Sequence, residues 1–375
     1  MKTAVSHSAA RHDWRAWLCL TTVLMSTAPA LAEDNSGQSF PSAPRLGEVI
    51  VTAPMLSEPL TVETDPRNPR QPVPPADGAG YLKNIPGFSV IRKGGIDGDP
   101  LLRGQGGSRL DVQLDGTPLL GGCGNRMDPP TAYIFPDSFD KLTVLKGPQS
   151  VVHGGTALGT VLVERETKRF QDLSYRGNAS ALYGSFDRND EVLDLAGGDK
   201  PGFIRVIGTH SSSDDYKDGS GRAVHSKYWR RNGTAMLGWT PSDDTALVAT
   251  IDKSEAEAAY ADRAMDGSKF DREGVNLRFT RKNLSSLVAK VQAQAYYNYV
   301  DHIMDGYSLR LNNRMGANNP DHLMEGGKAL VELTPRADTK ITMGTDVNHD
   351  LHSVRNLTNA QYLAGQRIED KTRVS

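Results

Sequence analysis

The chain has 375 residues, of which 38% are hydrophobic and 23% charged, with a formal net charge of −2 at pH 7. So small a charge gives no reason to expect a nucleic-acid-binding protein. After residue 32, no stretch approaches the roughly 20 consecutive apolar residues of a membrane-spanning helix. The composition describes a polar protein with room for two domains and no helical membrane anchor.

The N-terminus has the three parts of a secretory signal. Basic residues precede an apolar run at 16–25, and residues 30–32 read Ala-Leu-Ala before Glu33. This order is typical of a cleaved signal peptide. Residues 1–32 are therefore expected to be removed on export.

Removal of this segment would take away Cys19 and leave Cys123, because the sequence contains two cysteines. A single thiol cannot form an internal disulfide, the usual role of cysteine in an oxidising compartment. Four roles stay open for Cys123: a buried inert thiol, an intermolecular bridge, a nucleophile or a metal ligand.

Residues 33–80 are rich in Pro, Ser and Asp and predict an extended, mobile arm. One short β-prone run stands within this arm. Such a run suits pairing with the sheet edge of another protein, although a stray apolar run is the favoured interpretation of the segment taken alone. The run consists of Glu48, Val49, Ile50, Val51, Thr52 and Ala53.

Residues 81–170 predict a compact α+β domain with short strands at 88–92, 111–114 and 141–146. A tight turn is expected at 115–118, which reads Asp-Gly-Thr-Pro. The glycine-rich run at 103–109 lacks the strand and helix of a dinucleotide-binding loop, so that function is not favoured.

From residue 171 to the end, alternating segments are separated by polar loops. The clearest is 287–300, where apolar odd positions alternate with polar even positions. We count about nine strand candidates after residue 174. A sandwich also alternates, but long strands ending in tyrosines and long polar loops favour an outer-membrane barrel.

Three segments resemble the plug domain of TonB-dependent outer-membrane receptors. They read GYLKNIPGFSV (80–90), LLRGQGGSRLDVQLDGTPL (101–119) and VLKGPQSVVHGGTALGTV (144–161). The run at 48–53 is similar to the TonB box that precedes such plugs. The resemblance implies an α+β plug domain at 81–170 followed by an antiparallel transmembrane β-barrel from 171.

Within that family the chain resembles the copper-receptor group. The segments that carry this likeness are GGCGNRMDPPTAYIFP (121–136), YADRAMDGSKFDRE (260–273) and YNYVDHIMDGYSLR (297–310). The group has a C-x-x-x-M element in the plug and an H-x-M element in the barrel. The likeness implies that Cys123, Met127, His302 and Met304 bind copper.

The chemistry of these residues agrees with that assignment. Thiolate and thioether sulfur favour Cu(I), whereas zinc sites hardly use thioethers. If the even positions of 290–298 face the lumen, the same phase points His302 and Met304 inward and Asp301 outward. A bulge near Tyr296 would overturn this argument.

A second H-x-M consists of His322 and Met324, with Met315 nearby. It follows a turn signal at 318–321, so we interpret it as loop in preference to a secondary metal site.

The resemblance implies a receptor that captures and imports copper and is not an enzyme. Its implied partners are the TonB protein with ExbB and ExbD, outer-membrane lipid and copper as the transported ligand. An iron-siderophore or other metal chelate is the alternative cargo. A remote alternative is a periplasmic cysteine hydrolase with Cys123 as nucleophile and His153 as base.

Plugged transporters of this kind have 22 strands. About 200 residues after the plug would provide only some nine or ten at about 20 residues per strand and loop. We therefore expect an incomplete barrel and a truncated receptor.

Overall fold

The computed structural model describes residues 60–68, 71–148, 150–154, 156–310, 316–358 and 360–361. The predicted signal peptide, the TonB-box-like run at 48–53 and Met315 lie outside the described residues. None of the helices in the described residues is long and apolar enough to cross a membrane.

The N-terminal domain, residues 60–170, consists mainly of short strands. In its described residues, five strands form a sheet in the order β1-β6-β7-β4-β5, and two more pair as β2-β3. The elements are β1 (Thr61–Thr64), α1 (Gly78–Leu82), β2 (Phe88–Arg92), β3 (Gly98–Leu102), η1 (Gly107–Arg109), β4 (Leu110–Leu114), β5 (Thr117–Pro118), η2 (Pro130–Tyr133), η3 (Pro136–Ser138), β6 (Lys141–Lys146) and β7 (Gly159–Glu164).

The strands expected at 88–92, 111–114 and 141–146 are confirmed as β2, β4 and β6. The predicted turn joins β4 to β5 and places Asp115 and Gly116 at φ values of 48° and 79°. One difference concerns β1, which lies inside the range expected to be a mobile arm. It pairs with β6 and buries Val62 completely, so apolar burial holds this part of the arm in the fold.

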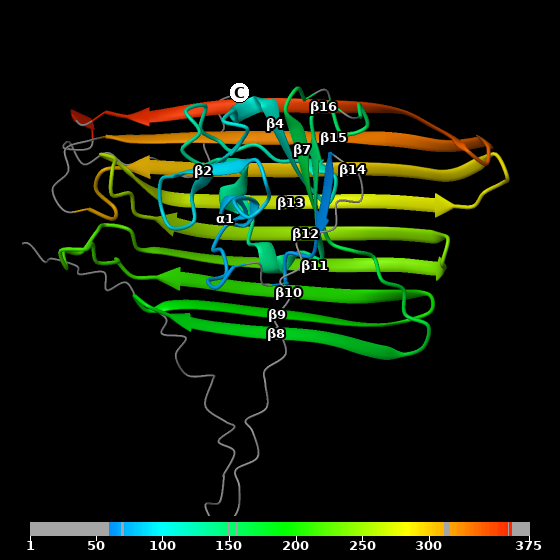
Figure 1. The fold of residues 1–375 in the computed structure, drawn as a ribbon, viewed down its shortest axis with the longest axis horizontal. Helices are drawn as coiled ribbons and strands as arrows, with labels where there is room; N and C mark the ends of the chain where they lie inside the picture. Colours follow the sequence, from blue (N-terminus) through cyan, green and yellow to red (C-terminus); the bar gives the residue numbers. More distant parts are fainter. Residues whose placement is uncertain are drawn as a thin grey trace, which may run out of the picture. The chain divides into compact units, whose positions relative to one another are not determined.

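The second unit of the fold, which we call the large sheet, contains nine antiparallel strands in the described residues and confirms the predicted number. Figure 1 shows these strands in sequence order from β8 to β16. They are β8 (Ser174–Gly184), β9 (Arg188–Asp199), β10 (Gly202–Ser213), β11 (Tyr228–Ser242), β12 (Thr245–Ala258), β13 (Asp266–Lys282), β14 (Val288–Asp305), β15 (Ala317–Arg336) and β16 (Thr339–Leu357).

The strand β14 has the predicted phase. Its even positions from Gln294 to Met304 are all buried, and its pairing with β13 continues through Tyr296 without a shift. Asp301 is on the other face but is buried as well, contrary to expectation. Its carboxylate accepts hydrogen bonds from Lys269 Nζ at 2.9 Å and Asn319 Nδ2 at 2.6 Å.

The two faces of the large sheet differ in chemistry. The face toward the N-terminal domain buries many polar side chains, whereas the opposite face exposes large apolar ones. This distribution is typical of an outer-membrane barrel, which has an apolar lipid face and a polar lumen. The exposed apolar residues include Leu193, Leu195, Ile204, Val206, Leu237, Trp239, Ile251, Val275, Leu277, Ile341, Met343 and Val347.

Arg230 on β11 ties the two units together. Its guanidinium, which is 1% exposed, donates to the backbone oxygens of Ala76 and Ile134 at 3.1 Å and Ile96 at 3.3 Å, and also to that of Ala132. The planar fork of an arginine can satisfy several carbonyls at once. One side chain thus fixes three separate stretches of the N-terminal domain to the sheet.

Candidate metal site

Cys123 and Met127 lie on the loop between β5 and η2, which we call the sulfur loop (residues 121–128). The completely buried carboxylate of Asp128 accepts hydrogen bonds from the backbone nitrogens of Gly122 at 2.6 Å and Cys123 at 2.8 Å. A side chain at Gly121 would place its Cβ 1.7 Å from the backbone oxygen of Asp128. The turn that presents Cys123 therefore needs glycine at 121 and a carboxylate at 128.

Two histidines of the large sheet contact the same loop. His322 Nδ1 lies 3.2 Å from the backbone oxygen of Gly121, and His352 Nε2 contacts that of Gly122. The two rings are 5.4 Å apart, and the other nitrogen of His322 contacts Asp350. Asp128 therefore binds the backbone N–H groups of the sulfur loop, and histidines of β15 and β16 bind its backbone carbonyl groups.

Cys123 is half-buried and forms no disulfide within the described residues. Burial raises the pKa of its thiol, and the nearby Asp128 carboxylate raises it further, while backbone N–H groups of Met127 and Asn125 act in the opposite direction. The thiol is therefore protonated at neutral pH, and a metal that binds it must displace a proton.

Met127 lies at the other end of the sulfur loop and packs against the apolar core that also contains Met304. Its backbone oxygen is 3.1 Å from the Tyr260 hydroxyl, and its sulfur is 3.8 Å from Arg263 Nη1. Both contacts come from the segment that joins β12 to β13. Met127 is thus positioned by the large sheet as well as by its own domain.

His302 and Met304 on β14 share the face toward the N-terminal domain and are 0% and 3% exposed. His302 Nδ1 lies 2.7 Å from the backbone oxygen of Lys269, and its ring is 4.5 Å from that of Phe270. A carbonyl oxygen only accepts, so Nδ1 carries the proton and Nε2 presents its lone pair. That Nε2 atom is buried and has no hydrogen-bond partner among the described residues.

The structure brings some of the predicted ligands together. Met127 and Met304 contact one continuous core, whereas Cys123 lies at the end of the loop next to His322 and His352. In the described part of the chain, no three His, Cys, Asp or Glu side chains form a group that could hold a metal ion. A site here therefore depends on the methionine sulfurs.

The interpretation of the second H-x-M as loop is wrong. His322 and Met324 belong to β15, face the N-terminal domain and are 6% and 1% exposed. His352 and Asp350, which the sequence did not predict as part of this region, are two residues apart on β16 and lie opposite His322 and Met324 in the strand register. Their alternation on β16 was the only available signal.

Comparison with known proteins agrees with this fold. Residues 65–161 match the family described as TonB-dependent Receptor Plug Domain. Together with the large sheet, this match places the chain among the TonB-dependent receptors. The N-terminal domain is accordingly the plug, and the prediction that the chain is not an enzyme is confirmed.

Among solved structures, the chain is 49% identical to the copper transporter OprC, with a TM-score of 0.79 over 82% of this chain and 48% of that one. The chain thus spans about half the length of this relative. No curated protein sequence matches.

Two further structures share the fold at low identity. The FrpB iron transporter from Neisseria meningitidis is 17% identical with a TM-score of 0.62, over 74% of this chain and 46% of that one. The Serratia marcescens hemophore receptor HasR is 17% identical with a TM-score of 0.63, over 79% of this chain and 45% of that one.

Proposed function

We propose that this receptor captures copper ions through Cys123, Met127, His302 and Met304 and passes them inward across the outer membrane. The observation that carries the proposal is the buried Nε2 atom of His302, which has no hydrogen-bond partner in the part of the chain that the structure describes. An imidazole whose Nδ1 donates to a backbone carbonyl is the usual arrangement of a metal-binding histidine, because that bond fixes the tautomer and the ring orientation.

The donor types favour copper over other metals. One thiol, two thioethers and one imidazole form a soft set that suits Cu(I), and zinc sites hardly use thioethers. The 49% identity to a protein named as a copper transporter supports the same cargo.

Transport would need energy, because the plug is fixed to the sheet by contacts such as those of Arg230. We propose that TonB, with ExbB and ExbD, supplies it by pairing with residues 48–53. Deletion of these residues should abolish copper uptake by cells and leave copper binding to the purified receptor unchanged. Loss of binding, or uptake that persists, would contradict this part of the proposal.

An iron chelate is the second candidate cargo. It is favoured by the fold relatives that are named as iron, ferric enterobactin and hemophore receptors, but these are at most 17% identical. A receptor for a chelate has no need of Cys123. Copper affinity that is unchanged in a Cys123→Ala variant would favour the chelate.

A secondary site of His322, Met324 and Met315 is also part of the proposal. Both ring nitrogens of His322 are engaged by Gly121 and Asp350. Copper could bind there only after the sulfur loop has left the sheet.

Titration of the purified receptor with Cu(I), buffered by a competing chelator, tests the main proposal. We expect one tight site, weakened at least about tenfold to a hundredfold by Cys123→Ala, because even outer-shell changes at metal sites have effects of this size. His210→Ala on β10 is the control, since His210 lies on the face away from the plug. Equal affinities in all three proteins would reject the proposal.

A further inference from the structure

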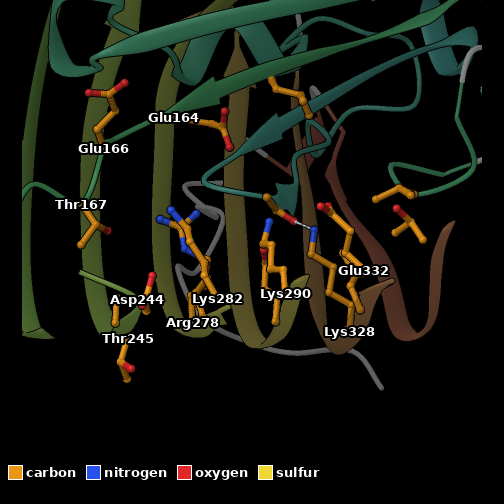
Figure 2. A pocket seen from close by; sticks show the side chains of 18 of the residues that line it. Glu164, Glu166, Thr167, Asp244, Thr245, Arg278, Lys282, Lys290, Lys328 and Glu332 are labelled. Atoms are coloured by element: carbon orange, nitrogen blue, oxygen red, sulfur yellow. Dashed lines mark hydrogen bonds between the residues drawn. The ribbon is translucent and has the colours of Figure 1, made fainter. Parts of the chain in front are cut away.

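A cavity of about 650 Å³ lies between the plug and the large sheet, away from the sulfur loop. It is lined by the end of β7, by the residues after it, and by strands β12 to β16 near the short turns that join them. Figure 2 shows Arg278, Lys290 and Lys328 pointing from the strands toward the segment that carries Glu164. The volume is that of a small-molecule site.

Three cations of this cavity, Arg278, Lys282 and Lys290, lie on one face of β13 and β14, with Glu332 opposite Lys290 in the register of β14 and β15. Lys282 on β13 stands directly opposite Lys290 on β14, and Arg278 lies four residues from Lys282 on the same face. Within the described residues, none of the three side chains has a hydrogen bond or ion pair. Like charges opposite each other on antiparallel strands destabilise a sheet, so this arrangement is unfavourable until an anion binds.

Most other charges that line the cavity are already paired. Arg169 pairs with Asp243 at 2.9 Å, and Lys340 pairs with Glu332 at 2.8 Å. Lys328 Nζ donates to the backbone oxygen of Gly116 at 2.8 Å, and Asp346 stands opposite Lys328 in the register of β15 and β16.

Two carboxylates that line the cavity, Glu164 and Asp244, form no ion pair within the described residues. Asp244 is engaged by Asn283 Nδ2 at 2.8 Å. Arg278, Lys282 and Lys290 therefore form a cationic cluster, because the carboxylate opposite it, Glu332, already pairs with Lys340. Burial lowers the pKa of His153, and the nearby Lys328 and Lys290 add to this effect.

We propose that this cavity binds a small anion that carries two or more carboxylate or phosphate groups. Such a ligand would neutralise Lys282 and Lys290 together and accept hydrogen bonds from the guanidinium of Arg278. Short turns of outer-membrane barrels face the periplasm, so the anion enters from that side. A bare metal cation is repelled here, and the cavity is therefore distinct from the proposed copper site and independent of it.

Binding of citrate and of pyrophosphate to the purified receptor, measured by calorimetry at low ionic strength, tests the proposal. We expect saturable binding of one equivalent of at least one of the two probes, and the stronger probe identifies the ligand as a carboxylate or a phosphate. The double variant Lys282→Gln/Lys290→Gln should bind at least tenfold more weakly, with unchanged affinity for copper.

The matched control is Lys253→Gln, because Lys253 on β12 is exposed and lies 3.5 Å and 3.7 Å from Glu255 and Glu273. It should bind the anion like the unaltered receptor. Absence of saturable binding of both probes, or an equal loss in the control and the double variant, would overturn the proposal. A receptor that binds the anion but shows no copper binding would reject only the proposed copper function.

Discussion

The Nδ1 atom of His302 lies 2.7 Å from the backbone oxygen of Lys269. This bond consumes the one ring proton of a neutral imidazole and leaves the opposite nitrogen, Nε2, as a lone-pair donor. Because Nε2 is buried and no described residue forms a hydrogen bond with it, the structure carries the desolvation cost of an unsatisfied polar atom at this position. Coordination of a metal ion would recover that cost.

The affinity for copper should rise with pH. Burial raises the pKa of the Cys123 thiol, so the metal-free receptor holds this proton at neutral pH and must lose it on binding. Below the thiol pKa, the affinity should rise about tenfold per pH unit. Titrations at pH 6, 7 and 8 check this slope. The copper affinity of the control variant Cys123→Ser should not change over the same pH range. Equal affinity at pH 6 and pH 8 in the unaltered receptor would speak against thiolate coordination.

His352 should position Cys123 through the backbone oxygen of Gly122. We expect His352→Ala to speed the alkylation of Cys123 by iodoacetamide several-fold in the metal-free receptor. The same variant should lower the affinity for copper about tenfold, as outer-shell changes do. His352→Gln keeps an N–H donor, so its alkylation rate and its copper affinity should both be close to those of the unaltered receptor.

The control for this prediction is His349→Ala, because His349 is exposed on the other face of β16. Alkylation rates that are equal in the His352→Ala variant and the unaltered receptor would show that the histidine does not hold the loop.

Arg165 joins the plug to β12. Its guanidinium contacts Asp115 Oδ2 at 2.7 Å and Asp252 Oδ1 at 3.0 Å, and its side chain is 4% exposed. Arg165→Ala leaves Asp115 without an ion pair in the described residues and Asp252 with only the 3.9 Å contact to Arg272, and should destabilise the packed plug by about 3–5 kcal/mol.

Protease resistance of the plug in increasing urea measures that loss. Lys168→Ala should cost less than about 1 kcal/mol, because the Lys168–Glu166 pair is exposed. Equal resistance of both variants would contradict the assigned role of Arg165.

Met304→Leu should separate sulfur chemistry from packing. The exchange conserves volume and costs less than about 1.5 kcal/mol of stability, but it removes a thioether. We expect a lower preference for Cu(I) over Zn(II) in competition titrations, and no change for Met236→Leu, which is buried in a separate cluster. An unchanged preference in Met304→Leu would remove Met304 from the site.

The sequence predicted the fold best where a local period determines it. Alternation along 287–300 was sufficient to orient His302 and Met304, because β14 pairs without a shift through Tyr296. The prediction of a loop after residues 318–321 was wrong because it also relied on a local sequence pattern. The Asn-Asn-Pro-Asp sequence of these residues is typical of a turn, yet Pro320 lies inside β15, opposite Val354.

The contacts of the sulfur loop could not be predicted from the sequence. His352 binds a backbone carbonyl 230 residues away. Because every residue has such a carbonyl, the residue types do not indicate which one is bound. β1 was likewise hidden in a proline-rich segment, because its pairing with β6 depends on tertiary contacts. Period and residue chemistry suggested the ligands, whereas the groups that hold them required the structure.

Metal content of the purified receptor tests the central claim most directly. After loading with copper and removal of excess metal, the unaltered receptor and His210→Ala should each retain one copper ion per chain. Cys123→Ala and His302→Ala should retain little or none. Equal copper in all four proteins would contradict the assignment of Cys123 and His302 as copper ligands.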